Sequence, residues 1–126
     1  MKTLSIIDTA YRATIEEQDD PIIWLGRALQ NAGAEVDILL SGNAVNYAVR
    51  GQKAGGLRFG DRAQTQPPDI ERELAAFGQK GGAVFFIEED ARARGIEKTD
   101  LVERLQPIGR GALVSLLEQY ERVWQF

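Results

Sequence analysis

The sequence predicts an α/β protein with a mainly parallel sheet that helices cover on both faces. Short apolar runs alternate along the chain with segments of helical period, the order that βα units produce. The stretch 82–96 shows this most clearly. Residues 83–87 form an unbroken apolar run typical of a strand buried on both faces, and three acidic residues then open a short helix. Arg92 and Arg94 lie in its last turn and Gly95 ends it, as the helix macrodipole and a left-handed cap favour.

The other elements follow from the same two periods and from Pro and Gly at their ends. Pro21 opens the first helix and Gly33 ends it. The polar stretch 8–20 before it is expected to be a loop. The expected strands are 3–7, 35–40, 83–87, 107–108 and 122–126, and the expected helices are 21–32, 44–49, 70–77, 88–94, 99–105 and 113–120.

Two of these elements carry more specific expectations. In the first helix the apolar positions recur at three- and four-residue spacing from Ile22, which places Ile23 and Trp24 off the core face. Trp24 then packs against a neighbouring element or forms part of a subunit interface. Strand 35–40 alternates only in part between apolar and polar residues, which predicts a less buried strand or an edge strand.

The composition excludes several kinds of catalytic and metal site, but it does not point to a particular one. The 126 residues, expected to form one domain (1–126), are 44% hydrophobic and 27% charged, and no apolar run approaches the roughly 18 residues of a membrane span. The chain has no cysteine and no histidine, which excludes thiolate nucleophiles, histidine bases and Cys/His zinc sites. We therefore expect no catalytic residue, no metal and no cofactor. More generally, we do not expect an enzyme.

The net charge of the chain indicates which partners to expect, and its N-terminal sequence indicates where in the cell to expect it. The net charge of −4 argues against nucleic-acid binding. No signal-peptide pattern follows Met1, so we expect a cytoplasmic protein that does not bind membranes.

The stretch 51–66 is a long, glycine-rich segment with little periodicity. Between residues 50 and 62, four basic residues stand against one acid, which reverses the sign of the chain's net charge locally. It is either a solvated loop, mobile in an isolated subunit, or a loop that contacts an anion or a neighbouring subunit. The charged residues are Arg50, Lys53, Arg58 and Arg62 against Asp61.

Polar side chains follow several of the predicted strands, and in a parallel sheet they gather at its carboxyl edge, where α/β proteins bind ligands. The three adjacent acids could supply a general base or magnesium ligands. Helix electrostatics explains them equally, through Glu89–Arg92 and Asp90–Arg94 pairs. Arg110, between two glycines before the last helix, could add charge at an anion site there. The candidate ligand-binding residues are Asp8, Tyr11, Asn43, Glu88, Glu89, Asp90, Arg94 and Arg110.

In order and spacing, the chain resembles the DsrE/DsrF-like family of small α/β proteins in bacterial and archaeal sulfur metabolism. The resemblance covers nearly the full length. It rests on a short N-terminal strand, the helix entry at 20–21 (Asp-Pro), the segment 32–36 (Ala-Gly-Ala-Glu-Val), the central strand followed by 93–96 (Ala-Arg-Gly-Ile), and the ending from 112–113 (Ala-Leu) through 122–126 (Arg-Val-Trp-Gln-Phe). It implies a three-layer α/β/α fold with a five-stranded sheet, assembled into trimers or hexamers. Several relatives relay sulfur as a cysteine persulfide, and the two positions where they place that cysteine fall here on Ile87 and Asp90.

These observations together predict an oligomeric accessory or binding protein of sulfur metabolism or sulfur relay. Because no other residue type holds a persulfide, this chain is not expected to carry sulfur itself. It could form homo-oligomers or assemble with cysteine-bearing relatives. The alternative is an enzyme or small-anion sensor that uses carboxylates and arginine at the carboxyl ends of the strands.

Overall fold

The computed structural model describes residues 1–11, 21–52, 56–65 and 67–126. A five-stranded sheet, parallel throughout, runs in the order β6-β5-β2-β1-β7. The fold class predicted from the sequence is thereby confirmed. Its strands are β1 (Lys2–Ile7), β2 (Glu35–Leu40), β5 (Val84–Ile87), β6 (Gln106–Ile108) and β7 (Arg122–Gln125).

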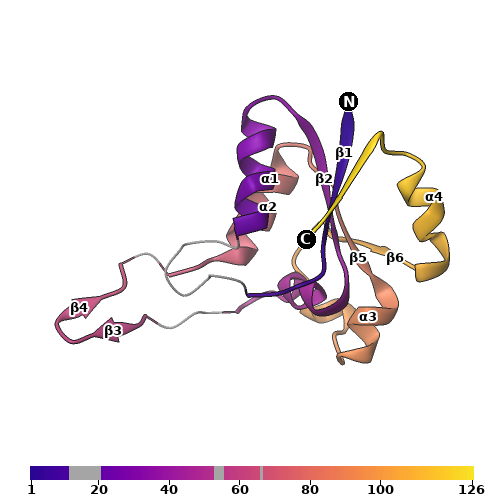
Figure 1. Ribbon diagram of the computed structural model, residues 1–126. Helices are drawn as coiled ribbons and strands as arrows, with labels where there is room; N and C mark the ends of the chain where they lie inside the picture. The colour runs from indigo at the N-terminus through magenta and orange to yellow at the C-terminus, as the bar shows by residue number, and fades with distance from the viewer. Residues whose placement is uncertain (12–20, 53–55, 66) are drawn as a thin grey trace.

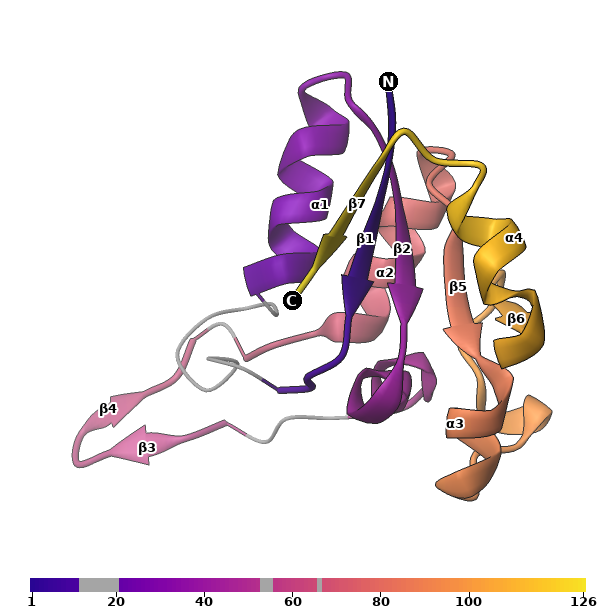
Figure 2. The same cartoon turned by 45° about the vertical axis from the view of Figure 1, so that its right-hand side comes forward.

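Helices cover the sheet on both faces (Figure 1). α1 (Pro21–Asn31) and α2 (Ile70–Gln79) pack together on one face, and α4 (Leu113–Leu117) lies on the other (Figure 2). At the carboxyl ends of the strands lie α3 (Glu88–Ala93) and the 3-10 helix η1 (Gly42–Ala48). The remaining elements are the 3-10 helices η2 (Lys98–Asp100) and η3 (Arg110–Ala112) and the short strands β3 (Arg58–Phe59) and β4 (Arg62–Ala63).

β2 is the middle strand, so the prediction that it is an edge strand was wrong. Its apolar residues are buried on both faces: Ile38 packs in the cluster under α1 and α2, and Leu39 in the cluster under α4. The polar residue that broke the apolar pattern is Asp37, which is buried although it is charged. Its hydrogen bonds, described below, make that burial possible.

The core face of α1 also differs from the prediction. Ile23, expected off the core, is completely buried, and Gly26 lies beside it on the sheet. A Cβ at Gly26 would lie 3.6 Å from Ile38 and 3.7 Å from Phe77, in ordinary van der Waals contact with both side chains. Trp24 lies off the core as expected, with 57% of its surface exposed.

Three further segments are shorter or differently wound than predicted. The expected helix 99–105 is reduced to η2, because the backbone is already extended at Leu101 (φ −84°, ψ 145°), which pairs with Val49 in an isolated bridge. Helix 113–120 ends as an α-helix at Leu117, and 44–49 is a 3-10 rather than an α-helix. Part of the stretch 51–66 forms a hairpin. The predictions for 12–20, including the helix cap at 19–20, and for Lys53 lie outside the described residues.

Asp37 joins four segments at the amino ends of the strands. Only 5% exposed, it accepts hydrogen bonds from the Ala83 amide (2.8 Å) and the Tyr120 hydroxyl (2.6 Å), and Lys2 Nζ lies 3.4 Å away. Lys2 also lies over the Tyr120 ring, 5.2 Å from its centre. These donors satisfy a charge in the middle strand that would be costly to bury alone.

Tyr120 should therefore affect stability at neutral and at alkaline pH. Burial first, and then the hydrogen bond to and charge of Asp37, raise the pKa of Tyr120 above its usual value. Above about pH 10 the unfolded chain loses this proton while the folded chain keeps it, so the free energy of unfolding falls as pH rises.

We predict that Tyr120→Phe lowers the free energy of unfolding by about 1–2 kcal/mol at pH 7 and reduces its loss above pH 10. Tyr11→Phe is the matched control. Because it leaves Tyr120 in place, its free energy of unfolding should still fall above pH 10 as far as Tyr120 causes that fall. Urea denaturation at several pH values measures both. If the free energy of unfolding of Tyr120→Phe fell above pH 10 as steeply as that of the wild type, this role of Tyr120 would be contradicted.

Candidate functional site

Asp8 joins three strands at the carboxyl edge of the sheet. It directly follows β1, and its Oδ1 accepts a hydrogen bond from the Ser41 hydroxyl at the end of β2. Its Oδ2 accepts a second bond from Gln125 Nε2 in β7, at 2.6 Å. The Asp8 carboxylate therefore links the ends of β1, β2 and β7 and is satisfied by neutral donors of the protein itself.

Asp90 makes the corresponding connection for the other strands. It lies in the first turn of α3, directly after β5, and its Oδ2 accepts from the Gly42 amide that follows β2 at 2.8 Å. Its Oδ1 forms an ion pair with the Arg110 guanidinium, which follows β6. Gly42 has a φ of +52°, and a Cβ there would lie 3.4 Å from the Asp8 carbonyl oxygen. The positive φ favours glycine at this position.

A second layer of contacts surrounds Asp90. Arg94 donates through Nη2 to Asn43 Oδ1 at 2.8 Å and through Nη1 to the Asp90 carbonyl oxygen at 3.1 Å. Glu89 Oε2 accepts from the Arg110 amide at 2.6 Å. Six of the eight candidate residues thus converge at this edge: Asp8, Asn43, Glu89, Asp90, Arg94 and Arg110.

The prediction of which residues form ion pairs with the acids of α3 was wrong. Arg92 pairs with Glu88, four residues earlier, at 3.5 Å, and not with Glu89. Asp90 pairs with Arg110 instead of Arg94. The reason is tertiary: residues from the start of η3 reach both Glu89 and Asp90, and these long-range donors replace the local partners.

Two candidate residues lie outside the convergence. Glu88 lines a cavity of about 550 Å³ on the other side of α3, with Phe86 and Leu105 among its apolar residues. Tyr11 contacts Tyr47 edge-on, with ring centres 5.1 Å apart, and its hydroxyl donates to Gln52. Burial raises the pKa of Tyr11 more than this hydrogen bond lowers it.

The electrostatics of Asp90 favour the ionised form of its carboxylate. Burial opposes its ionisation, but the hydrogen bonds from Gly42 and Arg110, with the charges of Arg110 and Arg94, hold its pKa below the usual value. Its side chain is 17% exposed. A general base active near neutral pH needs a raised pKa, so this arrangement suits a structural anion better than a proton acceptor.

Ile87 and Asp90 differ in access to solvent. Ile87 is buried in the core cluster under α4, as its place in the strand predicted. Asp90 is the one that reaches the surface, and it does so between the Gly42 amide and the Arg110 guanidinium. Any ligand at this edge would have to meet Asp90 and displace its contacts.

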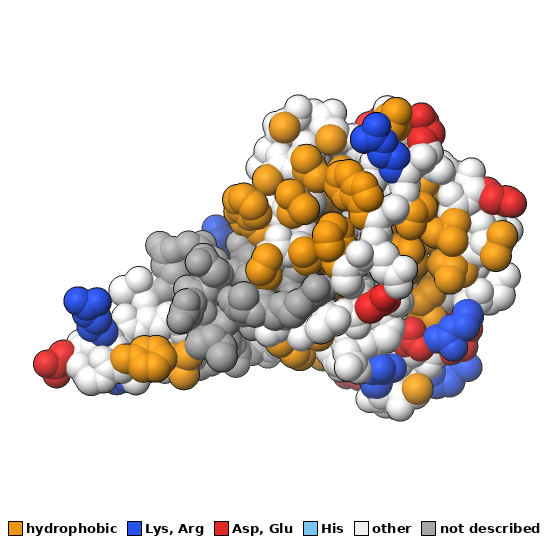
Figure 3. Space-filling view, in the orientation of Figure 1, with side chains coloured by type: hydrophobic (Ala, Val, Ile, Leu, Met, Phe, Trp, Pro, Cys, Tyr) orange, Lys and Arg blue, Asp and Glu red, His pale blue; other side chains and the backbone are white. Residues whose placement is uncertain are grey.

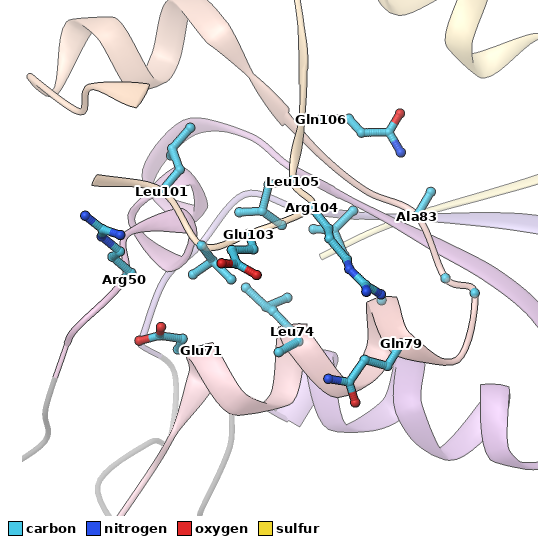
Figure 4. Close-up of a pocket in the computed structure, with 16 residues that line it drawn as sticks. Arg50, Glu71, Leu74, Gln79, Ala83, Leu101, Glu103, Arg104, Leu105 and Gln106 are labelled. Carbon is cyan, nitrogen blue, oxygen red and sulfur yellow. The ribbon is translucent and has the colours of Figure 1, made fainter. Parts of the chain in front are cut away.

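A second cavity, of about 490 Å³, lies at the opposite, amino ends of β5 and β6 and was not anticipated (Figure 4). α2 and the segment before β6 line it, with Arg50 and Arg104 facing the same space as Glu71 and Glu103. These residues are far apart in sequence, so no local pattern marked them. Its mixed charges do not define a ligand class.

The described residues contain no group of three or more His, Cys, Asp or Glu side chains that could hold a metal ion. Nor does any helix among them have the length and apolarity to cross a membrane.

Sequence reasoning found Asp8 and Asp90 but missed one hydrogen-bond donor to each of them. Gln125, in the last strand, had no motif around it, and the Gly42 amide is a backbone donor that side-chain patterns do not reveal. The parallel order of the strands was the signal that could have placed Gln125 beside Asp8.

Comparison with solved structures supports the fold. The chain is similar to the YchN protein of E. coli, with a TM-score of 0.74 and 20% sequence identity over 100% of both chains. It is also similar to MTH1491, a protein of unknown function from Methanobacterium thermoautotrophicum, with a TM-score of 0.66 and 14% identity over 99% of this chain and 98% of that one. No protein-family model and no curated protein matches the sequence. At these identities the likeness establishes a YchN-like fold.

Asp90 should stabilise the folded state in proportion to its ionisation. We predict that Asp90→Asn lowers the free energy of unfolding at pH 7 by about 1–3 kcal/mol, because an anion that accepts an amide and a guanidinium bond is lost. A depressed folded-state pKa gives stability that is complete above about pH 4 and lost as pH falls through the folded pKa. The difference between the variants should therefore shrink in acid.

Glu88→Gln is the matched control for this measurement, because the Glu88–Arg92 pair is exposed and should contribute less than about 1 kcal/mol. Chemical denaturation between pH 2 and pH 7 measures all three proteins. Equal stability of Asp90→Asn and the wild type at pH 7 would refute the role of Asp90.

Proposed function

We propose that the chain is a DsrE-like accessory protein of sulfur relay in the cytoplasm, which assembles into oligomers and does not itself carry sulfur. The observation that carries this proposal is the environment of Asp90. It occupies one of the two positions of the family's persulfide cysteine, and two donors converge on its carboxylate. The YchN-like fold is consistent with this family.

The donors around Asp90 are those that a reactive sulfur would need. A backbone amide at the start of a helical turn and a guanidinium stabilise a thiolate and lower its pKa. Here the same two groups hold a carboxylate that cannot accept sulfur. We infer that the anion site has kept its shape while its chemistry has changed. A binding or structural role within an assembly then remains, as a homo-oligomer (trimer or hexamer) or together with cysteine-bearing relatives.

The alternative, a carboxylate and arginine enzyme or an anion sensor, has less support. Convergence of Asp90, Arg94 and Arg110 is the feature that favours it. However, Asp90 uses both of its oxygens within the protein, and Arg94 and Arg110 donate to protein acceptors. A substrate or an anion would have to break these contacts before it could bind.

Replacing Asp90 by cysteine tests whether the carrier geometry persists. We predict that Asp90→Cys folds and that its thiol reacts with an alkylating reagent with a pH midpoint at least about one unit below that of an exposed thiol. Ser115→Cys, exposed on α4, is the control, and both variants contain a single thiol because the chain has no other cysteine. The rate of thiol alkylation between pH 5 and pH 10 gives both midpoints.

The Arg110 contribution can be separated with a double variant. Adding Arg110→Gln to Asp90→Cys should move the midpoint back toward the control. Equal midpoints for Asp90→Cys and Ser115→Cys would mean that the site no longer stabilises a sulfur anion, and the proposed link to the sulfur carriers would fail.

A further inference from the structure

Residues 56–65 form a hairpin, here called the arm, that projects from the body of the molecule (Figures 1 and 2). β3 and β4 pair antiparallel, with Arg58 opposite Ala63 and Phe59 opposite Arg62. A two-residue turn of Gly60 and Asp61 joins them, and the φ of +61° at Gly60 fits the glycine-first turn of tight hairpins.

The arm has no core of its own. All four residues of its strands are exposed, and Phe59, a large apolar side chain, is 70% exposed. Leu57 at its base is also among the exposed large hydrophobic residues. An isolated two-stranded hairpin is marginally stable in water and needs a packing partner. The surface that stabilises the arm is therefore expected outside the arm.

A complementary apolar surface lies on the body. Trp24 extends from the outer side of α1 with 57% of its surface exposed. Trp124 in the edge strand β7 pairs with Ser5, which pairs with Ile38 under α1, so Trp124 lies on the same sheet face as α1. It is only partly buried. Figure 3 shows hydrophobic side chains gathered over α1 and toward β7. We call Trp24 and Trp124, with the outer side of α1, the α1–β7 face.

The two surfaces fit different molecules of the same chain. In both ribbon views the arm points away from α1, so the α1–β7 face that receives it belongs to another copy. Two arginines and one aspartate give the arm a net charge of +1, and because α1 and β7 contain no acidic residue, a contact between the arm and the α1–β7 face is apolar and not electrostatic. Contact between unlike surfaces is heterologous, and such contacts close into rings of three or more copies when the rotation allows. Trp and Phe are also enriched in protein interfaces.

We propose that the arm of one copy packs on the α1–β7 face of a second copy, with Phe59 against Trp24 and Trp124. This inference rests on the proposed assembly and assigns the contact that holds it together. It also explains why a segment rich in glycine and basic residues carries an exposed phenylalanine.

The first experiment removes each side of the contact. Phe59→Ser and Trp24→Ser change exposed residues, so both should fold, which circular dichroism checks. Sedimentation velocity at micromolar concentration should show the wild type as an oligomer and each variant with its dissociation constant raised at least tenfold. Val114→Ser, at a residue of α4 that is 67% exposed, is the matched control and should sediment as the wild type does.

The second experiment identifies the contact directly. Phe59→Cys is mixed with a size-tagged Trp24→Cys under mild oxidation, and a disulfide between the two chains should form at least tenfold faster than with a tagged Val114→Cys. Trypsin should cut the arm arginines of the Phe59→Ser protein faster than those of the wild type.

The outcomes separate this inference from the proposed function. An oligomeric wild type with unaffected Phe59→Ser and Trp24→Ser variants would overturn the arm contact and leave the assembly standing. A wild type that sediments only as a 14.0 kDa monomer would overturn both. Disulfide formation no faster than in the Val114 control would also overturn the contact.

Discussion

Two carboxylates hold the carboxyl edge of the sheet together, and the candidate site depends on them. Asp8 binds the ends of β1, β2 and β7, and Asp90 binds those of β5, β2 and β6. All five strands of the sheet are thereby linked through two side chains. Short parallel strands end in loops with free backbone donors, and the half-buried Asp90 carboxylate satisfies one of them, the Gly42 amide. The donors at the carboxyl edge are consequently occupied by carboxylates of the protein itself.

This occupation of the donors shapes the functional interpretation. In an open α/β sheet the carboxyl edge is the usual place for a ligand, and here the principal donors, Gly42 and Arg110, are already bound to Asp90. These donors form an anion-binding site, and the anion that occupies it is the protein's own Asp90 carboxylate. An assembly role follows more directly than catalysis, and the exposed apolar surfaces of the arm and α1 are where such a role would act.

The sequence predicted the five strands of the main sheet, their parallel direction and most of the residues that meet at its carboxyl edge, because apolar runs and polar strand ends are local signals. It failed where a distant partner decided the outcome. Asp37 gave β2 the alternating pattern of an edge strand, but the Ala83 amide and the Tyr120 hydroxyl donate to this carboxylate and allow it to be buried in the middle strand. Asp90 took Arg110, twenty residues away, over the nearer Arg94. Ile23 is buried, although the spacing of the apolar residues in α1 placed it off the core face.

The most direct test of the proposed role is the composition of the native assembly. Protein tagged at its own gene and purified at its natural level would be analysed by native mass spectrometry. The account predicts multiples of the 14.0 kDa subunit, alone or with cysteine-bearing sulfur-transfer subunits bound in fixed ratio. A single 14.0 kDa species, or an assembly only with proteins unrelated to sulfur transfer, would contradict it.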